Sequence, residues 1–111
     1  LDYFGFDLQP DQEDEQTYPD KFTIYDNYPN PFNPLTTISY FIPEDSRVKI
    51  EIFDMMGRKV KNLVNNSQKS GQQSVKWNAT NNFGNPVSTG VYFYKIQSGR
   101  VVKTNKMCYI K

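Results

Sequence analysis

The side chains that could perform chemistry in this chain are few and far apart. There is no histidine, which removes the commonest general base and the commonest transition-metal ligand. Cys108 is the only cysteine, so no disulfide can form within the chain. The serines and acids therefore lack the partner that a hydrolytic triad needs. Glu44 and Asp45 follow Pro43, and a solvated turn is a better interpretation of this pair than a cation site. The sequence indicates no enzyme, no catalytic residue, no metal site and no cofactor.

Charge divides the chain into an acidic arm and a basic body. Residues 1–20 carry seven acids and no lysine or arginine, whereas residues 21–111 carry five acids and all 13 bases, a net charge of +8. The simplest interpretation is a solvated linker beside a basic surface, and the alternative is an arm that docks on a basic face of its own body or of a neighbour. The basic cluster at residues 57–61 is too short to predict nucleic-acid binding.

The arm itself has two parts. Phe4, Phe6 and Leu8 alternate with small or polar residues, which is a short strand pattern. The segment that follows, QPDQEDEQTYPD, is acidic and bounded by prolines, as linkers are. We therefore expect a linker over residues 1–21 and one domain over residues 22–111. The strand pattern fits the end of a preceding domain, a flap on its own domain, or a strand that Phe4, Phe6 and Leu8 donate to a neighbour.

Apolar residues recur at every second position through the body and predict seven strands. Their ranges are 22–25, 36–42, 47–53, 58–64, 72–78, 91–97 and 100–111. The side chains expected to face the core are Ile38, Tyr40, Ile42, Val48, Ile50, Ile52, Val60, Val75, Trp77, Tyr92, Tyr94, Ile96, Met107 and Tyr109. Lys49 and Glu51 should face outward, Gly57 should turn the chain, and Ser98-Gly99 should join the last two strands. With no helical period, the pattern predicts an all-β, seven-stranded antiparallel immunoglobulin-like β-sandwich with an N-terminal extended arm.

Three prolines within residues 28–34, YPNPFNP, constrain the chain just before its first long strand. Proline has no N–H to donate to a strand ladder, so this segment must be an edge or a crossover rather than a central strand. Phe32 can still hold the segment to the sandwich by its ring. Phe32 and Trp77 are therefore the expected structural anchors.

Four blocks of the body resemble a known family. They are NYPNPFNPLTTISYFIP (27–43), VKIEIFDMMGRKVKNLV (48–64), VKWNATNNFGNPVSTGVYFYKI (75–96) and KMCYIK (106–111). In this order and spacing they resemble the type A C-terminal sorting domain of the type IX secretion system, and also the related immunoglobulin-like domain of the flagellar hook-capping protein. The family usually has Trp-Asp-Gly where this chain has Trp77-Asn78-Ala79.

The resemblance implies a non-catalytic module at the end of an exported protein, with a secreted or bacterial cell-surface location. The implied partners are the outer-membrane secretion machinery and its shuttle, without direct membrane insertion, and the family's cargo is often cleaved from the domain and attached to surface lipopolysaccharide. The residues that match the family's recognised elements are Gly90, Val91, Tyr92, Lys106 and Lys111.

Two other functions remain open on the sequence alone. The chain could be a structural subunit of an extracellular filament, a homo-oligomer in which the strand at residues 3–8 adds to a neighbour's sheet. It could also be an accessory carbohydrate-binding module, which would require an exposed row of aromatic rings on one sheet face.

Overall fold

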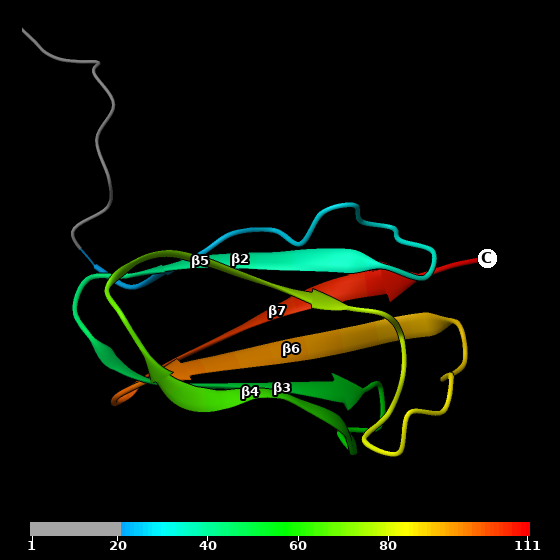
Figure 1. The fold of residues 1–111 in the computed structure, drawn as a ribbon. Helices are drawn as coiled ribbons and strands as arrows, with labels where there is room; N and C mark the ends of the chain where they lie inside the picture. Colours follow the sequence, from blue (N-terminus) through cyan, green and yellow to red (C-terminus); the bar gives the residue numbers. More distant parts are fainter. Residues whose placement is uncertain (1–20) are drawn as a thin grey trace, which may run out of the picture.

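The computed structural model describes residues 21–111, and all seven regular elements of that part are β-strands. They are β1 (Thr23–Ile24), β2 (Thr36–Ile42), β3 (Ser46–Asp54), β4 (Lys59–Gln68), β5 (Gly71–Trp77), β6 (Gly90–Ser98) and β7 (Val101–Tyr109). Figure 1 shows two layers of strands, with the C-terminus at one end. The predicted seven-stranded immunoglobulin-like sandwich is confirmed. The described part contains no helix long and apolar enough to cross a membrane.

The two layers are antiparallel sheets of different size. Sheet A has the order β1-β2-β5, and sheet B has the order β4-β3-β6-β7. The connections over residues 43–45 and 78–89 carry the chain from sheet A to sheet B. The consecutive pairs β1-β2, β3-β4 and β6-β7 each lie within one sheet, and the chain changes layer three times between them, as in a sandwich whose inner faces pack against each other.

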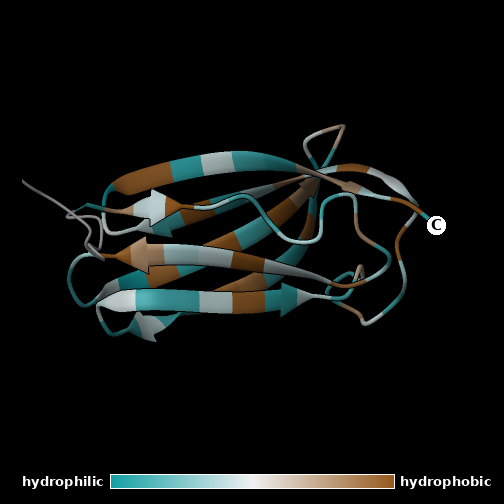
Figure 2. Ribbon diagram, turned by 90° about the horizontal axis from the view of Figure 1, so that it is seen from above, coloured by the Kyte–Doolittle hydropathy of each residue, from teal (hydrophilic) through white to brown (hydrophobic). Residues whose placement is uncertain are grey.

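The core forms because alternate residues of each long strand point between the sheets. Figure 2 shows hydrophobic and hydrophilic bands alternating along the strands. Twelve of the expected inward residues are buried, whereas Val60 and Val75 are partly buried and pack against the core from its margin. Full burial of each aliphatic side chain contributes about 1.5–3 kcal/mol, which is why the alternation predicts the fold so well.

The proline corner (residues 28–34) crosses from one sheet to the other. Tyr28 forms a bridge to β2, and Phe32 forms a parallel bridge to β7. The Phe32 N–H donates to the Cys108 carbonyl at 3.0 Å, and the Phe32 carbonyl accepts from the Ile110 N–H at 3.0 Å. The expectation of a crossover is confirmed. The corner also covers the end of β7, which would otherwise present an open sheet edge.

Every strand boundary lies within two residues of the expected one except the last residue of β4, and the turn between β6 and β7 is shifted by one residue. β4 continues past residue 64, because residues 65–68 pair with the first residues of β3 even though they are polar. The turn between β6 and β7 consists of Gly99 and Arg100 instead of Ser98 and Gly99, because Ser98 still pairs with Val101. In both places backbone pairing extends a strand beyond its apolar pattern.

Gly57 gives a first testable prediction. Its φ of +83° lies in the left-handed region, where a side chain is strained, although a Cβ there would meet nothing within 4 Å. Replacing Gly57 by alanine should therefore lower the free energy of unfolding by about 1 kcal/mol, measured by urea denaturation. Gly57→Asn is the matched control, since asparagine tolerates this conformation better and should cost less. Equal losses for the two variants would contradict the backbone explanation.

Candidate functional site

The residues expected to be recognised converge on the end of the sandwich that carries the C-terminus. Gly90, Val91 and Tyr92 begin β6, while Lys106 lies in β7 and Lys111 follows it. Since β6 and β7 are neighbours in sheet B, Gly90 pairs with Tyr109, Val91 with Cys108, and Phe93 with Lys106. Residues about 20 apart in the sequence thus form one surface, which we call the C-terminal end (Figure 1).

The structure gives these residues different accessibility. Lys106 and Lys111 are exposed, and Gly90 and Val91 are partly exposed. Tyr92 is buried at 6% exposure, and its hydroxyl donates to the Ser88 carbonyl at 2.5 Å. Burial raises the pKa of the Tyr92 hydroxyl. Tyr92 therefore holds the loop in front of β6, and its neighbours offer the accessible atoms.

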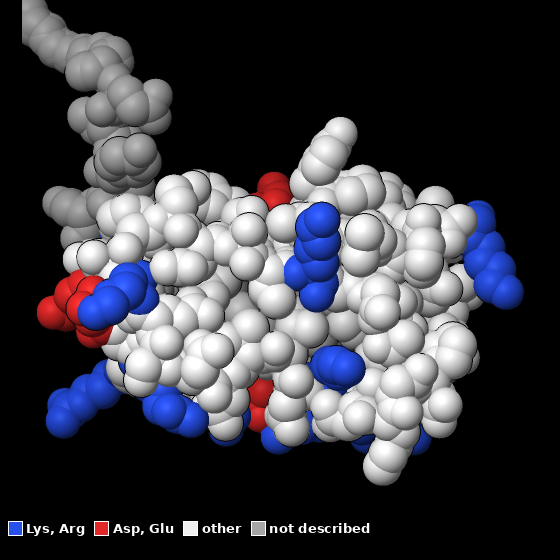
Figure 3. All heavy atoms as spheres, in the orientation of Figure 1, with Lys and Arg blue, Asp and Glu red and all other residues white. Residues whose placement is uncertain are grey.

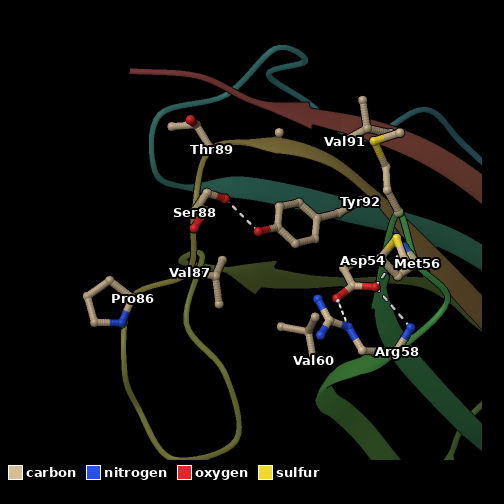
Figure 4. A pocket seen from close by; sticks show the side chains of 12 residues that line it. Asp54, Met56, Arg58, Val60, Pro86, Val87, Ser88, Thr89, Val91 and Tyr92 are labelled. Atoms are coloured by element: carbon tan, nitrogen blue, oxygen red, sulfur yellow. Dashed lines mark hydrogen bonds and ion pairs between the residues drawn. The ribbon is translucent and has the colours of Figure 1, made fainter.

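A groove of about 420 Å³ lies between the start of β6 and the turn that joins β3 to β4 (Figure 4). In the close-up, Val60 and Val87 lie on opposite sides of the hollow, and Met56 lies at its rim near Asp54. Its lining residues are Asp54, Met55, Met56, Arg58, Val60, Pro86, Val87, Ser88, Thr89, Gly90, Val91 and Tyr92. A second hollow of about 370 Å³ lies on the other side of Gly90, against residues 108–111. The C-terminal end therefore has two hollows, each lined by both apolar and polar residues.

Asp54 fixes the turn that forms one wall of the groove. One carboxylate oxygen accepts from the backbone N–H groups of Met56 and Arg58, each at 2.9 Å. The other oxygen accepts from Arg58 Nε at 2.9 Å (Figure 4). The Arg58 backbone N–H, together with the Met56 N–H and the Arg58 guanidinium, lowers the pKa of Asp54 against the opposing effect of desolvation. The ionised carboxylate thus holds an exposed methionine pair in a defined place.

Four aromatic rings support the C-terminal end from inside the core. The Phe32 ring is stacked on Tyr109 at 5.3 Å between centroids and tilted against Trp77 at 5.8 Å. The Trp77 ring meets Tyr92 edge-on at 5.4 Å. Phe32 and Trp77 are each 1% exposed. The cluster therefore joins the proline corner, β5, β6 and β7 beneath the surface that the groove occupies.

The turn after β5 keeps a left-handed residue without a glycine. Ala79 has a φ of +61° and is buried, and its carbonyl accepts from the Val87 N–H at 3.0 Å. The Trp77 indole N–H donates to the Thr80 carbonyl at 2.9 Å. The loop over residues 78–89 is thereby tied to itself and to the core, even though alanine stands where the family usually has glycine.

Sequence reasoning missed part of this surface. Met55 and Met56 are 71% and 78% exposed, and Phe83 and Ile110 are also exposed near the same end. The signal was present as two methionines inside a turn, where polar residues are usual. Met55 and Met56 line the groove together, and exposed apolar patches are typical of surfaces that bind a protein partner.

Within residues 21–111, no group of three or more cysteines and acids could hold a metal ion. Cys108 is a half-buried thiol whose backbone is paired on both sides. Phe4, Phe6 and Leu8, the residues expected to donate a strand, lie outside the described residues.

Comparison with known families gives one match over most of the chain. The family described as "Secretion system C-terminal sorting domain" matches residues 26–111. This range includes the proline corner, all strands of sheet B and every residue of the C-terminal end. No curated protein sequence matches the chain.

Similar solved structures include two proteins of Porphyromonas gingivalis. PorZ, an essential bacterial surface component of the type IX secretion system, is 28% identical with a TM-score of 0.56, over 79% of this chain. Dimeric latent PorU is 21% identical with a TM-score of 0.67, over 90% of this chain. FLGD of P. aeruginosa is 20% identical with a TM-score of 0.54, over 84% of this chain and 74% of its own. The match spans only 11% of the PorZ chain and 10% of the PorU chain.

Proposed function

We propose, from the premise that this chain belongs to the family of secretion system C-terminal sorting domains, that its C-terminal end is the surface by which the type IX machinery recognises it. The chain carries a sorting signal for type IX secretion, and such a signal implies export to the surface or the medium. We also assign residues 22–111 as the part of the chain that the secretion machinery recognises. Burial of Phe22 at 5% exposure supports this boundary.

One observation carries the proposal. The accessible residues of the family's recognised elements, Val91, Lys106 and Lys111, lie at the same end as the exposed pair Met55 and Met56. A groove of mixed apolar and polar lining near lysines suits a partner that offers an apolar side chain and a carboxylate, because the apolar side chain is desolvated and the carboxylate is paired. The proposed partners are the outer-membrane machinery and its shuttle.

In this proposal the domain acts by binding alone. Its rigid sandwich presents the end surface while the cargo at the other side of the linker stays independent. A later step in this proposal is attachment of the exported protein to the cell surface, which follows recognition of the domain. The sandwich itself contributes no reacting group to that step.

A reporter fusion tests the proposal. Residues 22–111 are attached to a reporter protein in a bacterium with the type IX machinery, and the exported fraction of the reporter is measured. Charge reversal of both exposed lysines, Lys106→Glu with Lys111→Glu, should lower export roughly tenfold, which corresponds to about 1.4 kcal/mol of lost recognition.

The matched control reverses two bases at the opposite end of the sandwich, Lys69→Glu with Arg100→Glu. Both residues are exposed, one in the turn between β4 and β5 and the other in the turn between β6 and β7. This variant has the same net charge and should be exported like the parent. Equal export of the two variants, with both folded by circular dichroism, would reject recognition at the C-terminal end.

A further inference from the structure

The outer face of sheet B carries a regular array of bases and two aromatic rings, of which the proposed sorting surface uses only Lys106. The strand register places these residues in three rows across β4, β3, β6 and β7. The rows are Lys59–Phe53–Phe93–Lys106, Asn62–Glu51–Lys95–Thr104 and Asn65–Lys49–Gln97–Val102. We call this surface the lysine face. In Figure 3, blue side chains gather along the lower border of the molecule, where β3 and β4 lie in Figure 1.

Glu51 organises the centre of this face. Its carboxylate lies 2.6 Å from Lys59 Nζ, 3.6 Å from Lys49 Nζ and 3.6 Å from Lys95 Nζ. The side chain was expected to face outward and does so, yet the three lysine side chains cover it to 4% exposure. One carboxylate among three ammonium groups leaves two positive charges at the centre of the face.

The lysines are held in place and remain accessible. The side chains of Lys49, Lys59 and Lys95 are between 39% and 45% exposed. Lys95 Nζ also lies 5.4 Å from the centroid of the Phe53 ring. A lysine that is already ordered loses less conformational entropy when it pairs with a second anion. The lysine face is therefore prepared for an acidic ligand.

An acidic segment exists in the same chain. Residues 11–20 contain five acids and no base, and they directly precede Lys21. The chain joins the body beside β7, because Lys103 of that strand lies over the ring of Phe22, with Nζ 5.9 Å from the centroid. Because side chains alternate along a strand, Lys103 lies on the same side of sheet B as Met107, and a chain that leaves this junction reaches the lysine face around the edge formed by β7. An extended chain spans up to about 3.3–3.6 Å per residue, so residues 11–15 can reach up to about 30 Å from this junction.

We propose that the acidic residues 11–20 bind the lysine face of their own body. A tethered ligand acts at an effective concentration on the order of millimolar, so weak ion pairs suffice to keep it bound. The contact would shield the lysine face from other polyanions and would weaken as salt screens the charges. A second copy of the chain and an anionic polysaccharide are the competing occupants, and the experiment separates them.

The test compares the full chain with a variant that neutralises four acids, Asp11→Asn, Glu13→Gln, Asp14→Asn and Glu15→Gln. Amide chemical shifts are recorded by NMR at about 20 mM and about 500 mM salt. We expect shift differences at low salt that centre on Lys49, Lys59 and Lys95, do not depend on protein concentration, and vanish at high salt. The matched control neutralises Glu44 and Asp45 and should leave the lysine face unchanged.

Three results would overturn the proposal. The first is identical spectra of parent and variant at low salt. The second is shift differences that grow with protein concentration, which would assign the lysine face to a second copy. The third uses heparin as a probe polyanion: we expect the neutralised variant to bind heparin about tenfold more tightly than the parent, and equal affinities would show that the segment does not cover the face.

Discussion

Replacing Phe32 by alanine is expected to lower the free energy of unfolding by about 3–5 kcal/mol, as truncation of a buried aromatic ring does. The ring is 1% exposed and contacts both Tyr109 and Trp77. Its removal leaves a cavity at the point where the proline corner meets β5 and β7. The two backbone hydrogen bonds of Phe32 survive the substitution, so the loss measures the ring itself.

Phe83 supplies the matched control for this experiment. It is the same residue type but 87% exposed, in the loop between β5 and β6. Thermal unfolding should show a melting temperature roughly 15–30 °C lower for Phe32→Ala and nearly unchanged for Phe83→Ala. If the two variants melt together, the ring of Phe32 does not anchor the corner.

Replacing Glu51 by glutamine should cost about 1–2 kcal/mol at neutral pH. The substitution keeps the shape but leaves Lys49, Lys59 and Lys95 close together without their common counter-charge. Breaking a fully buried ion pair costs more, about 3–5 kcal/mol, but these lysines can turn toward water, which reduces the loss. Urea denaturation at low salt measures the difference.

The pH dependence of this effect has a defined sign. Burial raises the pKa of Glu51, but the Lys59 hydrogen bond and the charges of Lys49 and Lys95 outweigh burial and lower it overall. Because the folded-state pKa lies below the unfolded one, the stabilisation is fully present above pH about 4.3 and is lost as pH falls through the folded-state pKa. The difference in the free energy of unfolding between the parent and Glu51→Gln should therefore disappear as pH falls through that range. Glu44→Gln, an exposed acid in a turn, is the control and should show no such gap.

The alternation of apolar and polar residues along the strands was sufficient to predict the sandwich. In β2, β3 and β6 every second residue is large and apolar, and Ile38, Ile50 and Ile96 are completely buried as expected. The last strand was harder, because residues 101–104 have no clear apolar face, yet Met107 and Tyr109 do face the core. The burial of large side chains dominates the stability, so the fold follows from their spacing.

The features that the sequence did not reveal depend on contacts between distant residues. Residues 65–68 lack strand propensity and are held in β4 only by pairing with β3. Glu51 resembles any outward acid until the register brings Lys59 and Lys95 beside it. The groove requires the turn at residues 54–58 to lie beside the start of β6. The extended β4, the lysines around Glu51 and the groove all arise from the register of strand pairing, which a single sequence does not show.

The central claim is that the C-terminal end of the sandwich contacts the secretion machinery, and site-specific photo-crosslinking in exporting cells tests it most directly. A crosslinking residue replaces Val91 at that end or, as the control, Val101 at the far end of the same sheet. We predict an adduct with an outer-membrane component from position 91 and little from position 101. Adducts of equal yield from both positions, or from position 101 alone, would contradict the account.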